Sequence, residues 1–161
     1  MNYYELFEID EAPVVDRNVV SKKFIDLQKK FHPDFYTNEN EAEKEFAMEQ
    51  SANINKAYKT FTNKENTIEY FLRLKDIITA DEKFNLPPEF LMEMMELNEG
   101  FDDSENIEKQ IEQFGKNLEE DVKYLIDPAQ QTEFSPTQLQ DLKMYYYKKK
   151  YLNRILDRLD D

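Results

Sequence analysis

The sequence predicts an all-α protein built from two helical parts, and three observations favour this fold class. The chain has 2 glycines among 161 residues, where average usage of ~7% would supply about eleven. β-Hairpins use glycine in turns that need positive φ, so a sheet protein is disfavoured. Apolar residues recur at spacings of three and four along the periodic segments, which is the period of an amphipathic helix. Prolines and polar capping residues precede several of these segments, as they do at helix starts.

Composition excludes several function classes. The 2 glycines cannot form the glycine-rich loops that hold phosphates. The chain has no cysteine, which excludes disulfides, thiolate metal sites and cysteine nucleophiles. The net charge of −14 disfavours nucleic-acid binding, because phosphate contacts need a basic surface. No apolar run approaches the ~18 residues that span a bilayer, and the first residues lack the pattern of a signal peptide. We therefore expect a cytoplasmic protein that binds neither nucleic acid nor membrane.

Charge is unevenly distributed along the chain and indicates two modules. Residues 1–75 hold 11 basic and 14 acidic side chains, whereas residues 76–161 hold 10 basic and 21 acidic ones. The change falls near a segment rich in proline and polar residues that reads as a connector. We predict a first domain at 1–75, a connector at 76–87 and a second domain at 88–161.

The first module is predicted to contain four helical segments. A short helix over Tyr3 to Phe7 comes first. The next helix carries Val20, Phe24, Leu27 and Phe31 on one face, and it should begin near Asp16–Asn18, both of which are plausible caps. This helix should end at His32, because a residue that precedes proline disfavours the α region. Further helices are expected over 41–61 and 65–74.

The second module is predicted to contain three helices joined by short connections, which make an antiparallel bundle. The first begins at Pro87-Pro88 and ends near Gly100. The second begins at Ser104 and continues to about Leu125. The third has the clearest start in the chain, because Ser135-Pro136-Thr137-Gln138 is a capping box with proline at the first helical position.

The single histidine lies in the tripeptide His32-Pro33-Asp34, at the end of a basic helix. Judged alone, a histidine before proline is most often a helix-end residue, and a charge run is most often a solvated helix face. As a recognition device, the tripeptide would present Asp34 at the apex of a rigid loop. Four lysines of the same helix would then form an electrostatic docking face for an acidic partner, namely Lys22, Lys23, Lys29 and Lys30.

The first module resembles a J-domain. The resemblance rests on Asn2-Tyr3-Tyr4-Glu5-Leu6-Phe7, on Lys29-Lys30-Phe31-His32-Pro33-Asp34 and on Ile54-Asn55-Lys56-Ala57-Tyr58. It implies a co-chaperone that binds a DnaK-type heat-shock chaperone and stimulates its ATP hydrolysis. His32, Pro33 and Asp34 would be the essential loop, and the four lysines would support it.

The segment Phe90 to Phe101 has two apolar faces when it is placed on a helical wheel. One side of the helix carries Phe90, Met94, Leu97 and Phe101. The opposite side carries Leu91, Met92 and Met95, beside Glu96 and Glu99. Three interpretations stay open for the second face. It packs against the first module, or it binds a partner protein, or its carboxylates hold a metal. The metal interpretation lacks the Glu-x-x-His partner of helical carboxylate sites.

The run Phe90-Leu91-Met92-Glu93, with Glu96-Leu97 and Glu99, resembles the HscB family when it follows a J-domain. Members of that family are J-type co-chaperones of iron–sulfur cluster assembly. The resemblance covers nearly the whole chain and, without an added cysteine-containing segment, favours the bacterial form. It implies an L-shaped arrangement, binding of the IscU scaffold protein and its delivery to the chaperone HscA. The matching scaffold-binding positions are Leu91, Met92, Met95, Glu96, Glu99 and Tyr151.

The resulting hypothesis is an adaptor that performs no chemistry and needs no cofactor or metal. It would recruit a DnaK/HscA-type ATPase on one face and present an IscU-type scaffold on another, with self-association left open.

A nucleic-acid contact is another possible interpretation of the aromatic and basic run Tyr145-Tyr146-Tyr147-Lys148-Lys149-Lys150-Tyr151. The acidity of this module favours instead an extension of the scaffold patch by Tyr147 and Tyr151. The alternative function is a J-domain co-chaperone for a different client protein.

Overall fold

The computed structural model describes residues 1–36, 40–99, 104–127 and 133–160, and these residues form helices and no strand. The chain divides into two compact units, Met1–Phe71 and Leu72–Asp161. The predicted all-α class is confirmed. The domain limits at 75 and 88 stay a prediction. Within the described ranges, no helix is both long enough and apolar enough to cross a membrane.

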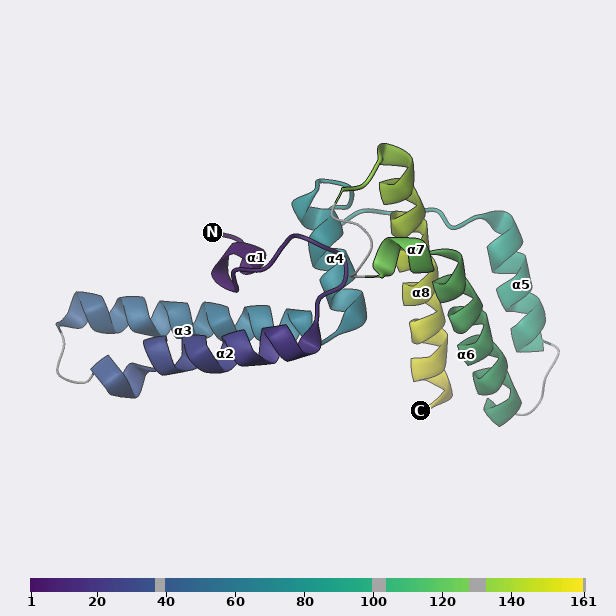
Figure 1. Cartoon of the computed structure of the whole chain (residues 1–161). Helices are drawn as coiled ribbons and strands as arrows, with labels where there is room; N and C mark the ends of the chain where they lie inside the picture. The colour runs from purple at the N-terminus through teal and green to yellow at the C-terminus, as the bar shows by residue number, and fades with distance from the viewer. Residues whose placement is uncertain (37–39, 100–103, 128–132, 161) are drawn as a thin grey trace. The chain divides into compact units, whose positions relative to one another are not determined.

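The first unit is built on a long helical hairpin (Figure 1). Helix α2 (Arg17–Phe31) packs against α3 (Glu41–Phe61), and both bounds agree closely with the sequence prediction. Of the two candidate caps, Asp16 is the one that caps α2, since its side chain accepts hydrogen bonds from the amides of Asn18 and Val19. The rings of Phe24 and Tyr58 stack across the hairpin with centroids 4.0 Å apart.

The short helix α1 (Tyr3–Leu6) seals the end of the hairpin that is remote from the His-Pro-Asp loop. Tyr4 and Phe7 are fully buried against Phe61 of α3. Tyr3 stacks on Tyr70 of α4 (Lys64–Leu74), with ring centroids 4.5 Å apart, and its amide donates to the Tyr70 hydroxyl. This aromatic cluster fixes the base from which the two long helices project.

The second unit contains α5 (Pro88–Glu99), α6 (Ser104–Asp121), α7 (Lys123–Ile126) and α8 (Pro136–Leu159). Helix α6 packs on both α5 and α8, as Figure 1 shows. The core of this bundle is apolar and consists of Phe90, Met94, Ile107, Ile111, Leu152 and Ile155. The predicted capping box at Ser135 is present, because Ser135 and Gln138 exchange side-chain and backbone hydrogen bonds.

One helix is shorter than expected. The sequence predicts a helix from Ser104 to about Leu125, whereas α6 ends at Asp121 and a separate turn, α7, follows. Val122 leaves the helical region, with φ −112° and ψ 10°. The last turn of α6 contains carboxylates and no basic residue, which is unfavourable at the negative end of the helix dipole. The acidic turn thus favours the break.

Candidate functional site

The His-Pro-Asp loop lies where α2 ends. His32 caps the helix in an extended conformation, and its amide still donates to the carbonyl of Gln28 over 2.9 Å. Pro33 then starts a 3-10 turn, η1 (Pro33–Tyr36). The amide of Asp34 donates to Nδ1 of His32 over 3.2 Å, and the amide of Phe35 donates to the His32 carbonyl over 3.0 Å. These local bonds hold the loop in one shape.

Asp34 is presented to solvent by this loop. Its side chain is 85% exposed, and one carboxylate oxygen lies 3.5 Å from Nδ1 of His32. The Tyr36 hydroxyl donates to the carbonyl of Lys30 over 2.8 Å and ties η1 back to the last turn of α2. The geometry therefore offers a rigid, accessible carboxylate at the tip of the hairpin, as the sequence analysis expects for a docking loop.

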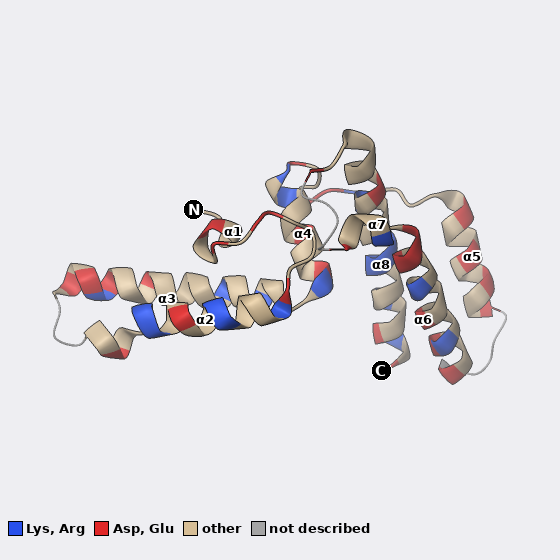
Figure 2. Cartoon of the chain, in the orientation of Figure 1, with Lys and Arg blue, Asp and Glu red and all other residues tan. Residues whose placement is uncertain are grey.

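The four predicted lysines all lie on α2, but they are not equivalent. Lys22, Lys29 and Lys30 are exposed. Lys23 is partly buried, and its Nζ lies 3.4 Å from a carboxylate oxygen of Glu8. In Figure 2 the ribbon of α2 carries several basic positions, whereas the start of α3 is predominantly acidic. The face available to an acidic partner therefore consists mainly of the three exposed lysines.

The structure adds two aromatic residues that the sequence analysis did not select. Phe35 follows the tripeptide directly and is 66% exposed, and its ring centroid lies 6.0 Å from that of His32. Phe46 of α3 is also exposed and makes an edge contact with Phe31. The sequence signal that could have identified Phe35 is its position directly after the His-Pro-Asp tripeptide. These rings give the charged tip an apolar border.

The second predicted site lies on α5, and its residues differ in exposure. Met92 and Met95 are 60% and 56% exposed, and Glu96 and Glu99 are exposed beside them. Leu91 differs from the expectation that it projects away from the bundle. It is partly buried and packs against the bundle core, because it lies on the flank between the two faces of the helix. Phe101 of the opposite face lies outside the described residues.

Tyr151 of α8 contacts the other side of α5. Its ring meets that of Phe90 edge-on, with centroids 5.7 Å apart, and it packs against the bundle core. Tyr147 lies one turn earlier and stacks on Phe84 of the connector, with centroids 4.4 Å apart and planes 6° from parallel. Tyr146 is buried. Tyr151 thus stands next to the α5 helix, whereas Tyr147 belongs to a contact between α8 and the connector.

Glu82 anchors that connector. Its two carboxylate oxygens lie 2.6 Å from Nζ of Lys143 and 2.9 Å from the Tyr147 hydroxyl. The hydrogen bond from Lys143 is the largest influence that holds the pKa of Glu82 below its ordinary value of 4.5, and the Tyr147 hydroxyl acts in the same direction. Residues 82–86, which we name the strap, are therefore fixed along α8. Sequence reasoning missed this contact because nothing local marks the pairing.

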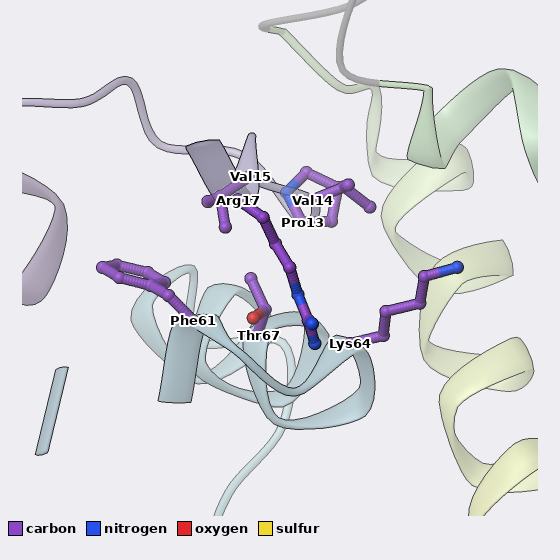
Figure 3. Close-up of a pocket in the computed structure, with 7 residues that line it drawn as sticks. All are labelled: Pro13, Val14, Val15, Arg17, Phe61, Lys64 and Thr67. Atoms are coloured by element: carbon purple, nitrogen blue, oxygen red, sulfur yellow. The ribbon is translucent and has the colours of Figure 1, made fainter. Parts of the chain in front are cut away.

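A small cavity of about 140 Å³ lies in the first unit, between the start of α2 and the start of α4 (Figure 3). Its polar groups already serve the fold. The Arg17 guanidinium donates to the carbonyl of Thr62, and the buried Thr67 hydroxyl lies within 3.0 Å of the Thr60 carbonyl. Apolar residues supply most of the remaining wall, namely Pro13, Val14, Val15 and Phe61. We interpret the cavity as part of the junction between these helices.

No group of three or more metal-ligating side chains gathers in the parts of the chain that the structure describes. Within the same described ranges, the carboxylates of Glu93, Glu96 and Glu99 on α5 do not form such a group. The candidate sites are thus two surfaces: the loop at the hairpin tip and the face of α5.

Comparison with known proteins connects both units to one family. Residues 86–160 match the family described as the HSCB C-terminal oligomerisation domain. A curated co-chaperone protein HscB homolog of Vibrio cholerae is 40% identical over 100 residues, which are 62% of this chain and 58% of that protein. An iron-sulfur cluster co-chaperone protein HscB homolog of Arabidopsis thaliana is 27% identical over 152 residues, covering 92% of this chain and 60% of that protein. The chain spans less than two thirds of these relatives.

Solved structures extend the match to the complete fold. Chaperone HscB from Vibrio cholerae superposes with a TM-score of 0.63 and 28% identity, covering 99% of each chain. Human co-chaperone protein HscB superposes with a TM-score of 0.81 and 24% identity, covering 99% of this chain and 81% of that one, and supports the fold. Together these matches support the assignment of the chain to the HscB family.

Proposed function

We propose that the protein is a co-chaperone that joins a DnaK/HscA-type chaperone to an IscU-type iron–sulfur scaffold. The His32-Pro33-Asp34 loop and the exposed lysines of α2 bind the chaperone and stimulate its ATP hydrolysis. The exposed face of α5, together with Tyr151, binds the scaffold. The protein acts in the cytoplasm as an adaptor and catalyses no reaction itself. The names of the curated relatives support the co-chaperone role.

One observation carries the proposal: each unit presents a separate exposed docking feature. The first unit offers the carboxylate of Asp34, which is 85% exposed on a loop held by its own hydrogen bonds. The second unit offers Met92 and Met95, both more than half exposed beside two carboxylates. Exposed apolar patches with a polar border are typical of protein-binding surfaces, and methionine adapts well to a partner.

A chain with two such features acts by linkage. Binding two proteins at once raises their effective concentration for each other, without a new contact between them. The basic residues of α2 would accelerate encounter with an acidic surface of the chaperone. The adaptor needs no group that reacts, and its role ends when the chaperone has received the scaffold.

Scaffold binding can be tested by calorimetry with a purified IscU-type protein. We expect the double variant Met92→Ala/Met95→Ala to weaken binding by at least tenfold, or about 1.4 kcal/mol. Leu91 is left intact, because its partial burial would mix a stability effect with a binding effect. The matched control is Met48→Ala on α3, where the side chain is also 60% exposed. An unchanged affinity in the double variant would favour a different client.

A further inference from the structure

Helix α8 carries a basic and aromatic face in an otherwise acidic half of the chain. It holds 6 of the 10 basic residues of residues 76–161, against 2 acidic ones. On a helical wheel, one set of side chains falls within about 100°. This set, which we name the basic face, consists of Lys143, Tyr147, Lys150, Tyr151, Arg154 and Arg158. The buried residues Tyr145 and Leu152 point the other way.

The strap forms a wall beside this face. Glu82 is bound by Lys143 and by the hydroxyl of Tyr147, and Phe84 stacks on the Tyr147 ring. Lys143 also places its Nζ 5.6 Å from the centroid of the Phe84 ring. These contacts hold the strap at a fixed position along α8. The space between the strap and α8 therefore has a defined shape.

That space is a concavity of about 310 Å³. Its walls are aromatic and include Phe84, Tyr147 and Tyr151, and three cations line it: Lys83, Lys150 and Arg154. All three cations are exposed, and within the described ranges none of them forms an ion pair. The one carboxylate in the lining, Glu82, is already occupied by Lys143 and Tyr147. The concavity therefore presents uncompensated positive charge over an aromatic surface.

The concavity shares one residue, Tyr151, with the proposed scaffold-binding site. Tyr151 lines it and also contacts Phe90 of α5. Lys148 links the same two helices, with its Nζ 5.5 Å from the centroid of the Phe90 ring. A partner that covers the exposed side of Tyr151 would therefore lie next to the cations of α8.

We propose that this concavity binds an acidic segment of the scaffold protein that docks on α5, an inference that rests on the proposed function. Carboxylates of that segment pair with Lys150, Arg154 and Lys83, while an apolar neighbour packs on the Tyr147 and Tyr151 rings. The carboxylates of Glu96 and Glu99 repel such a segment from α5. Opposite charge on the two helices thus fixes the orientation in which the scaffold binds.

The experiment compares two charge-reversal variants in calorimetric titrations with the IscU-type scaffold. Lys150→Glu/Arg154→Glu should weaken binding by at least tenfold at low salt, and the loss should shrink as salt rises. The matched control is Lys116→Glu/Lys123→Glu, which changes the net charge equally at two exposed positions of α6 and α7. The control therefore measures the effect of net charge alone, and its affinity should stay within about twofold of that of the unaltered protein.

The Met92→Ala/Met95→Ala variant separates the two failures. If it weakens binding while both charge-reversal variants behave alike, the concavity proposal is wrong and the scaffold role stands. If it has no effect, the scaffold role fails. The concavity is then tested alone by NMR titration with a synthetic peptide of four glutamates and one leucine. Shifts of the Tyr147 and Tyr151 ring signals that Lys150→Glu/Arg154→Glu abolishes support the site, and unshifted ring signals overturn it.

Discussion

The carboxylate of Glu82 lies 2.6 Å from Nζ of Lys143, although 61 residues separate them in the sequence. The ion pair is largely screened from solvent, with side chains 25% and 13% exposed. It is reinforced by the Tyr147 hydroxyl. A segment that reads as a connector in the sequence is therefore a fixed part of the second unit, and it forms one wall of the concavity on α8.

Replacement of Glu82 by glutamine should destabilise the second unit by ~1–2 kcal/mol, because a charge-assisted hydrogen bond is lost and Lys143 remains partly buried. This loss is measured by urea denaturation, with the hydrogen-exchange protection of the α8 amides as the readout. The control is Glu112→Gln, an exposed carboxylate on α6. Equal stability of the two variants would show that the pair contributes nothing.

The same pair predicts a dependence of stability on pH. The folded state holds the pKa of Glu82 below its ordinary value of 4.5. The stabilisation is therefore complete above the unfolded pKa and is lost as the pH falls through the lower, folded pKa. The stability difference between the unaltered protein and Glu82→Gln should be constant from pH 7 to about 5 and should shrink below about 4.5. A difference that stays constant down to pH 3 would contradict this assignment.

Tyr4 predicts a loss of stability in alkali. Its hydroxyl donates to the Ala12 carbonyl over 2.6 Å, and burial is the main cause that raises its pKa far above the ordinary value of 10. Stability is complete below the unfolded pKa of about 10, and it falls as the pH rises above it, because only the unfolded state readily loses this proton. Tyr4→Phe should flatten this fall in denaturation experiments between pH 9 and 11. Tyr124→Phe, at an exposed position, should leave the slope unchanged.

Gly115 is a site where the protein should gain stability. A Cβ at this position would lie 2.9 Å from Nζ of Lys149 and 3.7 Å from Cδ1 of Leu152. The close atom is the end of a flexible side chain, which can move away. Alanine favours the helix over glycine by ~1 kcal/mol, so Gly115→Ala should raise stability by ~0.5–1 kcal/mol in thermal denaturation. A lower melting temperature would mean that Lys149 is fixed in place.

Local chemistry made most of the helices predictable. The proline after His32 ends α2, and the capping box at Ser135 begins α8, because each acts through its nearest neighbours. The His-Pro-Asp loop could be recognised for the same reason. Side chains with local partners, such as Asp16 with the first amides of α2, behave as the sequence predicts.

Features that depend on distant partners could not be predicted in this way. The pairing of Glu82 with Lys143 depends on how the strap lies along α8, which no local pattern specifies. The partial burial of Leu91 depends on the rotation of α5 within the bundle, and a helical wheel gives relative angles alone. The exposure of Phe35 depends on the path of the 3-10 turn after Pro33. Such details decide which residues of each candidate site are available to a partner.

The most direct test of the adaptor role measures single-turnover ATP hydrolysis by a DnaK/HscA-type chaperone, with and without the IscU-type scaffold. The unaltered protein should accelerate hydrolysis, and more strongly when the scaffold is present. Asp34→Asn should reduce the acceleration by at least tenfold while scaffold affinity in calorimetry stays unchanged. Asp141→Asn, at an exposed position of α8, should behave like the unaltered protein. Full stimulation by Asp34→Asn would contradict the account.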